Sequence, residues 1–478
     1  MCILKFIGPF LRINSINKNN INNELFHLSK ESVKHIVLNS KCGIVAPLEK
    51  FKNKSFSNND INTIKGFSPL LCVYKKADPK LKQDHGKLLW DNEKFKKEIN
   101  ISTNAFMTLC LLDLLDYYKN FKDISQDKYL YYNLYMNLCK NQLIFFASYL
   151  RNIEGIFVDK VDDTEVFSED LVFEDKNTKF KFSDQALLMC AYYKYSTFND
   201  KSSDEFKKFS LDILNMLLSY KDEIYNLPLN ELNKLCFGLN IFYDCSKDEN
   251  AKLLLMDICD LISNKYENKY FEGNENSVEY DCLVFINLSL INSYEKVLKF
   301  DEICGKVITK LLKMYDENLG IFCYNTEDKK LEFSSQDIMY YLFCLNIYSS
   351  NKDNTEYNQM IYNIFKYQIV NSGLILSWPE APNLDDIERY ADFSLKSSDL
   401  LDEQHFIMPN ISTPEKTLYA PIFTKNIYFQ KKKGCFKQNK TSFYSEPNFT
   451  IFFMIQYFKN RFKNIDKKPD TPIKEEEK

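Results

Sequence analysis

The chain has 478 residues, of which 45% are hydrophobic and 27% charged, the composition of a globular protein with a substantial core. The net charge is -4 and the isoelectric point is near 5.8. These values argue against a dedicated nucleic-acid binder, which would carry a strongly basic domain or face. No run of 18 apolar residues occurs, so we expect no membrane-spanning segment.

The 14 cysteines are spread from Cys2 to Cys435, and no two have the two-residue separation of zinc and redox motifs. Many lie in apolar helical stretches, where cysteine behaves as a small hydrophobe. We therefore expect free thiols, a reducing compartment and a cytoplasmic location. The first 15 residues contain Lys5 and Arg12 and lack a small-residue cleavage site, so they do not read as a secretory signal.

Twelve segments have apolar residues at every third or fourth position, which predicts helices. A single proline, Pro228, lies between Pro79 and Pro379, as long helices require. The predicted helices are residues 22–38, 102–119, 126–151, 183–197, 204–220, 229–243, 250–266, 277–294, 301–315, 335–348, 355–370 and 445–462.

Short and long connections alternate between these helices, so one end of a stack of hairpins should be smooth and the other rich in loops. The long connections share a glycine followed by apolar residues, which suggests a glycine-terminated helix and then a short strand. Their spacing is close to multiples of about 55 residues, which indicates a structural repeat. The shared glycines are Gly43, Gly155, Gly320, Gly373 and Gly434.

Several helices that follow a long connection begin with serine and a polar neighbour, as in Ser183-Asp184-Gln185 and Ser277-Val278-Glu279. Serine is a good helix cap, because its oxygen accepts from free amides of the first turn. Six outer and six inner helices of this kind resemble the α/α toroid, the six-hairpin barrel of many glycosidases and sugar epimerases. The resemblance is to the architecture over roughly residues 20–465, and it points to no single family.

We therefore expect an all-α fold: one α/α toroid-like domain over residues 1–465, with small β or irregular elements in the long loops at one end. Residues 44–101 should form an irregular arm, and residues 372–444 a loop insertion that serves as a lid or cleft wall. Residues 466–478 are charged and contain proline, which predicts a disordered tail.

In a toroid the inner helices begin around one mouth, so their first polar residues should face it. Two carboxylates there, one with a raised pKa, would suit acid–base chemistry on a sugar. The other interpretation is that these side chains cap helices. The candidate catalytic residues are Asp184, Glu279 and Asp337, and the candidate substrate-binding residues are Asn104, Gln185, Gln336 and Asn448; Asp281 and Glu446 belong to the same ring.

Trp378 stands two residues before Glu380 in the long insertion. A sugar ring stacked on the indole, with Glu380 as a catalytic carboxylate, would make chemical sense. A buried aromatic that anchors a proline-rich loop would explain the same residues.

The four histidines, His27, His35, His85 and His405, have no metal-ligand spacing, so we expect no metal site. No glycine-rich phosphate loop or dinucleotide fingerprint occurs, and we expect no cofactor. Two hypotheses remain. The first is a carbohydrate-acting toroid of glycoside hydrolase or epimerase type. The second is a non-catalytic binding or scaffold protein that uses the loop-rich end.

Overall fold

The fold is taken from a computed structural model. It describes residues 6–7, 11–12, 16–51, 56–84, 87–165, 170–177, 179–198, 200–271, 277–324, 329–350, 355–396, 398–399, 405–408, 413–414, 418–439 and 441–465. His85 and the predicted tail at residues 466–478 lie outside this part of the chain.

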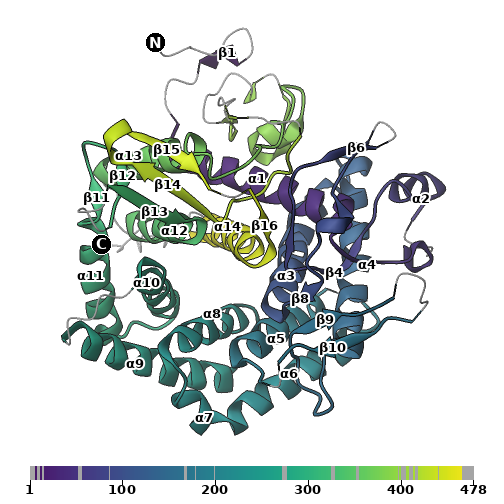
Figure 1. The fold of residues 1–478 in the computed structure, drawn as a ribbon, viewed down its shortest axis with the longest axis horizontal. Coiled ribbons are helices and arrows are strands. Elements are labelled where there is room, and N and C mark those ends of the chain that lie inside the picture. Colours follow the sequence, from purple (N-terminus) through teal and green to yellow (C-terminus); the bar gives the residue numbers. More distant parts are fainter. Residues whose placement is uncertain are drawn as a thin grey trace, which may run out of the picture.

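Six helices form a closed inner ring (Figure 1). Each contacts the next along the chain, and the last contacts the first. All six begin at the same end of the ring, which we call the mouth. The inner helices are α3 (Ile101–Tyr118), α5 (Phe182–Ser196), α8 (Leu229–Ser246), α10 (Val278–Asn292), α12 (Ser335–Ser350) and α14 (Ser445–Ile465).

Six further helices pack outside this ring and run back toward the mouth. Five of them follow their inner partner in sequence, whereas α14 at the end of the chain pairs with α1 at its beginning. All twelve predicted helices are therefore present, and the all-α toroid is confirmed. The outer helices are α1 (Lys18–Asn39), α4 (Gln126–Tyr149), α6 (Ser203–Ser219), α9 (Glu249–Phe271), α11 (Leu298–Leu312) and α13 (Thr355–Ile364), with short α2 (Asn58–Ile64) and α7 (Lys221–Tyr225) beside them.

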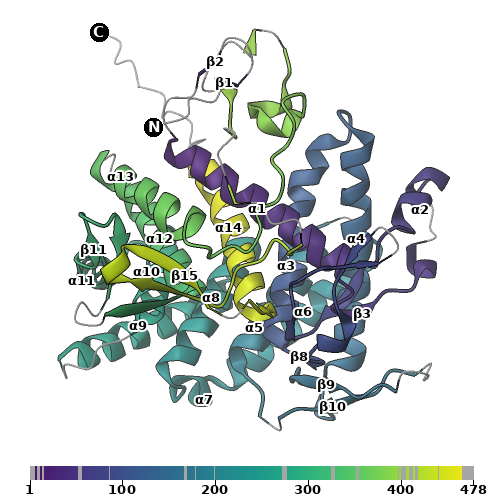
Figure 2. The ribbon, with the colours of Figure 1, turned by 45° about the horizontal axis from the view of Figure 1, so that its top comes forward.

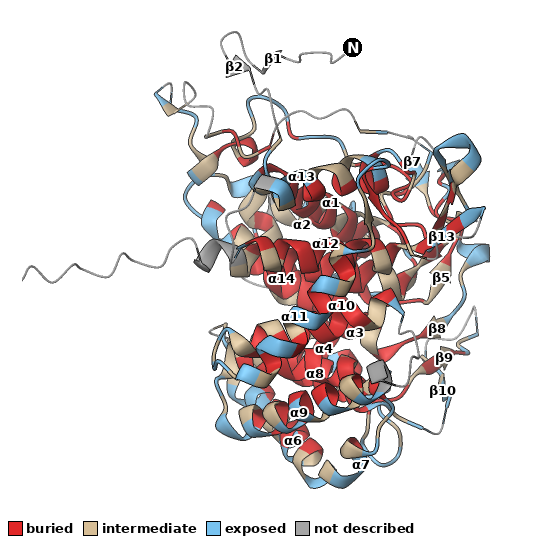
Figure 3. Cartoon of the chain, turned by 90° about the vertical axis from the view of Figure 1, so that its left-hand side faces the viewer, coloured by how far each residue is buried: buried red, intermediate tan, exposed pale blue. Residues whose placement is uncertain are grey.

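The inner helices are buried around most of their circumference, while the outer helices expose one face (Figure 3). Aromatic side chains meet inside the ring: the Phe453 ring centroid lies 5.4 Å from that of Phe106 and 6.4 Å from that of Phe237. Phe453 lies about two helical turns below the start of α14. The interior below the mouth is therefore filled by an apolar core.

Short antiparallel strands occupy the long connections (Figure 2). The largest sheet has the order β13-β14-β15, with Lys330 opposite Gln430 and Ser334 opposite Asn426. Its strand β13 leads directly into α12 at the mouth. The described strands are β1 (Phe6–Ile7), β2 (Leu11–Arg12), β3 (Gly43–Val45), β4 (Leu70–Val73), β5 (Lys76–Ala77), β6 (Lys82–Asp84), β7 (Lys87–Leu89), β8 (Glu98–Ile99), β9 (Lys160–Asp162), β10 (Phe173–Asp175), β11 (Tyr315–Asp316), β12 (Ile321–Phe322), β13 (Lys330–Ser334), β14 (Asn426–Gln430), β15 (Cys435–Gln438) and β16 (Phe443–Tyr444).

The repeated glycines have different roles. All three of Gly155, Gly320 and Gly373 have positive φ, but only Gly373 lies just after a helical segment, which ends at Val370. Gly155 lies in the turn between the bridged residues Arg151 and Phe157, and Gly320 in the hairpin between β11 and β12. Gly434 also has positive φ, but it lies in the hairpin between β14 and β15 rather than after a helix. Gly43 is required by close packing, because a Cβ there would lie 1.8 Å from the carbonyl oxygen of Cys72.

Residues 379–396, which we call the strap, cross the outside of the ring. Glu388 Oε1 accepts hydrogen bonds from Lys30 Nζ of α1 and from the Tyr117 hydroxyl of α3, both at 2.5 Å. Its Oε2 accepts from Lys128 Nζ of α4 at 2.5 Å. This buried cluster ties the first part of the predicted 372–444 insertion to three helices, and the later part supplies β14 and β15.

None of the described helices combines the length and apolar character needed to cross a lipid bilayer. The 13 cysteines in the described part of the chain are free thiols, and most are buried.

Candidate active site

Six carboxylates gather at the mouth of the ring. Five belong to the first turns of inner helices, and Asp159 lies in the connection between α4 and β9. The charges of their neighbours in this set raise the pKa values of Asp184 and Glu279. The set comprises Asp159, Asp184, Glu231, Glu279, Asp337 and Glu446.

Three of these carboxylates cap helices. Asp159 Oδ1 accepts from the backbone amide of Ile101 at 2.9 Å, and Glu231 Oε1 accepts from that of Ser183 at 2.9 Å. Asp337 Oδ2 accepts from the backbone amide of Ser334 at 3.1 Å, while Ser334 Oγ accepts from that of Asp337 at 2.9 Å. The last pair is a reciprocal capping box, so these groups satisfy free amides of helix starts.

The side chains of Asp184, Glu279 and Glu446 make no hydrogen bond within the described part of the chain. They belong to α5, α10 and α14, which are alternate helices of the inner ring. The charge of Glu446 raises the pKa of both Asp184 and Glu279.

Asp184 has the most unusual environment of the three. Its side chain is buried, with 4% of the residue exposed, and its nearest cation, Lys181 Nζ, lies 3.8 Å from Oδ2. The pKa of Asp184 is raised to about 8, chiefly by burial. The charge of Lys181 opposes this increase, and the charges of Asp159, Glu231 and Glu446 contribute to it. Asp184 therefore holds a proton at neutral pH and can donate it.

Glu279 is half-buried beside α12. Burial raises its pKa, with further upward contributions from Asp337 and Glu446 and a downward one from Lys234. Burial also raises the pKa of Asp337, although the hydrogen bonds from Ser334 oppose this. Gln336 Nε2 donates to the hydroxyl of the buried Tyr340 at 3.1 Å, close to Glu279. Glu279 and Asp337 thus lie near each other, with Gln336 on the same turn of α12 as Asp337, while Asp184 lies on α5.

Three predicted substrate-binding amides instead hold backbone. Asn448 Oδ1 accepts from the amide of Phe423 at 2.8 Å, and its Nδ2 donates to the carbonyl of the same residue at 3.0 Å. Asn104 binds both backbone groups of Val73 in this way, and Gln185 binds those of Phe157. We call each such pair of hydrogen bonds from one side-chain amide to the backbone of another segment a backbone clamp. The clamps attach long connections to inner helices, so the polar groups of these three amides are already occupied.

Trp378 and Glu380 lie apart from the carboxylates at the mouth. Trp378 is 4% exposed, and its ring packs edge-on against Phe365 with the centroids 6.4 Å apart. The Glu380 side chain is exposed, and its backbone oxygen lies 2.8 Å from Nε2 of His27 on α1. This geometry matches the interpretation of Trp378 as a loop anchor, and the proposed site does not include the pair.

Asp281, which was expected among the carboxylates at the mouth, instead forms an ion pair: its Oδ2 lies 2.7 Å from Lys310 Nζ of α11. The sequence pattern did not single out Asp159, Glu231, Lys181 or Lys234 as residues of the mouth. Glu231 had a signal, since it lies in the first turn of an inner helix, but Pro228 replaces the serine that marks the others. Within the described residues, no group of three His, Cys, Asp or Glu side chains is placed to hold a metal ion.

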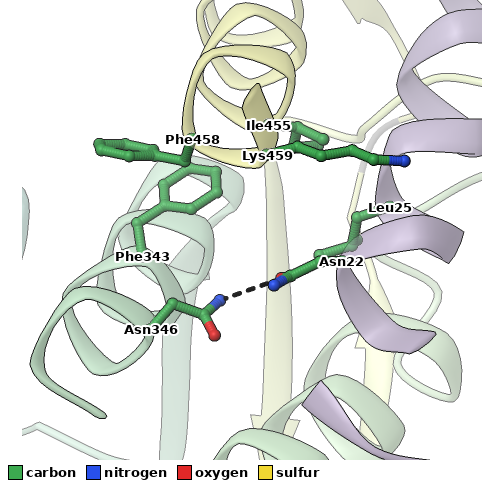
Figure 4. Close-up of a pocket in the computed structure, with 7 residues that line it drawn as sticks. All are labelled: Asn22, Leu25, Phe343, Asn346, Ile455, Phe458 and Lys459. Carbon is green, nitrogen blue, oxygen red and sulfur yellow. Dashed lines mark hydrogen bonds between the residues drawn. The ribbon is translucent and has the colours of Figure 1, made fainter. Parts of the chain in front are cut away.

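The opposite end of the ring has a different character. A small pocket there lies between α1, α12 and α14 (Figure 4). Asn346 Nδ2 donates to Asn22 Oδ1 at 3.4 Å, and the rings of Phe343 and Phe458 lie 5.3 Å apart. No carboxylate lines this pocket, so it offers no acid–base pair; its lining is Asn22, Leu25, Phe343, Asn346, Ile455, Phe458 and Lys459.

No protein-family model matches the sequence, and no curated protein matches it. Solved structures that align with this one include a glycoside hydrolase family 9 endoglucanase, J30. It has 8% identity and a TM-score of 0.46, and the alignment covers 94% of this chain and 86% of that one. A D-mannose isomerase has 8% identity and a TM-score of 0.44, with 73% and 85% covered. A GH76 α-mannanase from Bacteroides thetaiotaomicron has 10% identity and a TM-score of 0.41, with 81% and 93% covered.

Proposed function

We propose that the protein binds a saccharide at the mouth of the ring and acts on it by acid–base chemistry. The observation that supports this most is the buried carboxyl of Asp184, which makes no hydrogen bond to the described residues and whose pKa burial raises to about 8. Keeping a carboxyl buried without a hydrogen bond costs stability, and groups with shifted pKa values concentrate at functional sites.

In this proposal Asp184 is the general acid, which protonates a leaving or ring oxygen of the sugar. Glu279 or Glu446, on the neighbouring alternate helices, serves as the base or nucleophile. Gln336 and Tyr340 offer polar groups beside Glu279. The aromatic core below the mouth forms the floor, so the sugar is held at the loop-bearing end, beside the β13-β14-β15 sheet.

Hydrolysis and epimerisation both fit this arrangement, since each needs a proton donor and a proton acceptor. We favour glycoside hydrolysis, because a donor with a raised pKa paired with a second carboxylate is the minimum that the reaction requires.

A second candidate is a saccharide-binding protein without chemistry. It is supported by the filled interior of the ring and by the three carboxylates used as helix caps. This candidate needs the mouth for binding but has no use for the proton on Asp184.

The test is a panel of oligosaccharides incubated with the wild-type protein, D184N, E279Q and E446Q. Released reducing ends report hydrolysis, and NMR of the products reports epimers. The matched control is E205Q, which changes an exposed first-turn carboxylate of outer helix α6. We expect turnover that falls at least about a hundredfold in D184N and is unchanged in E205Q.

Binding without turnover in every variant would favour the non-catalytic candidate. Turnover that survives in D184N would exclude Asp184 as the acid.

A further inference from the structure

We infer that Cys236 and Cys259 form a modification site, at which a peroxide converts the two thiols into a disulfide that ties α8 to α9. Cys236 lies about two helical turns below the start of α8. The inference therefore does not depend on the proposed function at the mouth.

The two thiols face each other inside one helical hairpin. Cys236 lies on inner helix α8, and Cys259 lies on outer helix α9, which follows α8 in the chain and packs against it. Their Sγ atoms are 3.5 Å apart, and both residues are fully buried. A disulfide bond is about 2 Å long, so the two sulfurs need to approach by about 1.5 Å. Small rotations of the two side chains supply that approach.

Four other cysteines have a different kind of partner. Their sulfurs lie beside backbone carbonyl oxygens, to which a thiol can donate a hydrogen bond but with which it cannot form a cross-link. These contacts join Cys110 to Phe449 at 3.9 Å, Cys190 to Gly238 at 3.1 Å, Cys245 to Phe242 at 3.3 Å and Cys344 to Cys282 at 3.6 Å.

The surroundings of the two sulfurs differ, and the difference assigns their roles. Asn240 Nδ2 lies 3.7 Å from Cys236 Sγ and donates toward it, which stabilises negative charge on that sulfur. Burial holds the pKa of Cys259 well above its ordinary value, and Cys236 and Asp260 contribute to this shift. Cys236 is therefore the nucleophile, and Cys259 is the resolving thiol.

The reaction consumes one molecule of hydrogen peroxide. The sulfur of Cys236 attacks one peroxide oxygen, the O–O bond breaks, and the released hydroxide leaves as water with the Cys236 proton, so that Cys236 becomes a sulfenic acid. The sulfur of Cys259 then attacks the Cys236 sulfur, the S–O bond breaks, and hydroxide leaves as water with the Cys259 proton. The two thiols together lose two electrons, which reduce the peroxide to two waters.

Burial controls how fast the pair reacts. Neither thiol is exposed, so peroxide reaches the pair through local opening of the hairpin. Cys435 on β15 is the opposite case, since it is exposed. Oxidation of the pair should therefore be slower than that of Cys435, but it should end in a bond between two protein sulfurs.

The experiment treats the folded, full-length protein with hydrogen peroxide and follows the reaction over hours. Remaining thiols are blocked with N-ethylmaleimide, and mass spectrometry of peptides identifies the linked cysteines. Thermal unfolding is measured before and after oxidation, and again after dithiothreitol. C259A removes the resolving thiol. C190A is the matched control, because Cys190 is a buried inner-helix cysteine whose sulfur contacts a carbonyl.

We expect a linked Cys236–Cys259 peptide from most molecules after Cys435 has been oxidised. The midpoint of thermal unfolding should rise by about 3 °C and return with dithiothreitol, because the cross-link restricts the unfolded chain. The rise should be absent in C259A and persist in C190A. Unlinked Cys236 and Cys259 after complete oxidation of Cys435, or a bond from either residue to a different cysteine, would overturn the inference. The peptide analysis uses the wild-type protein, so it decides the question even if a variant fails to fold.

Discussion

At the scale of single residues, buried carboxyl groups make folding depend on pH in a defined direction. The pKa of Asp184 and that of Glu24 on α1 are each raised to about 8, in both cases chiefly by burial. Between pH 6.5 and 8 the folded chain therefore keeps protons that the unfolded chain has lost. The free energy of unfolding should fall across this window by about 2 kcal/mol for each group.

D184N removes one of these protons, and E24Q removes the other. We expect each variant to lose about half of the decline between pH 6.5 and 8, and the double variant to be nearly flat, as measured by urea unfolding. The window avoids the buried His27, whose pKa is lowered to about 4, chiefly by burial. A wild-type protein whose stability does not change across this range would contradict the assigned protonation.

At the scale of elements, the backbone clamps predict which amides matter for stability. N448A leaves the amide and carbonyl of Phe423 without partners in a buried connection, which should cost about 1–3 kcal/mol in unfolding free energy. Q336A is the matched control, because Gln336 lies in the first turn of an inner helix but bonds only to the Tyr340 hydroxyl. Equal effects of the two substitutions on thermal unfolding would count against the clamp.

The strap gives a second prediction at this scale. E388A removes one partner of a buried ion cluster and leaves the buried Lys30 with Glu31, at 3.1 Å, as its remaining counter-charge, so we expect a loss of about 3 kcal/mol. The partly exposed Asp386, whose Oδ1 is 3.0 Å from Lys128 Nζ, provides the comparison. D386N should cost less than about 1 kcal/mol by the same urea titration. A negligible effect of E388A would mean that the strap is not held by this cluster.

At the scale of the whole molecule, the sequence pattern predicted the ring well. The apolar period and the alternation of loop lengths depend on local chain geometry, so they located all twelve helices. The pairing of α1 with α14 follows from closure of the ring and leaves no local signature.

The site was predictable only in part. First-turn positions indicated that Asp184, Glu279 and Asp337 share one end of the fold. Whether such a carboxylate caps a helix depends on which backbone amide of another segment lies beside it, and that is set by tertiary packing. Trp378 and Glu380 are close in sequence, yet Trp378 is buried against Phe365 and Glu380 is exposed on the strap.

The most direct test of the central claim is a pH titration of the Asp184 carboxyl, followed by NMR of protein labelled with carboxyl-¹³C aspartate. The resonance is assigned by its loss in D184N. We expect a midpoint near pH 8. A midpoint near the ordinary value of 3.8 would show an ionised Asp184 at neutral pH and would contradict its role as the proton donor.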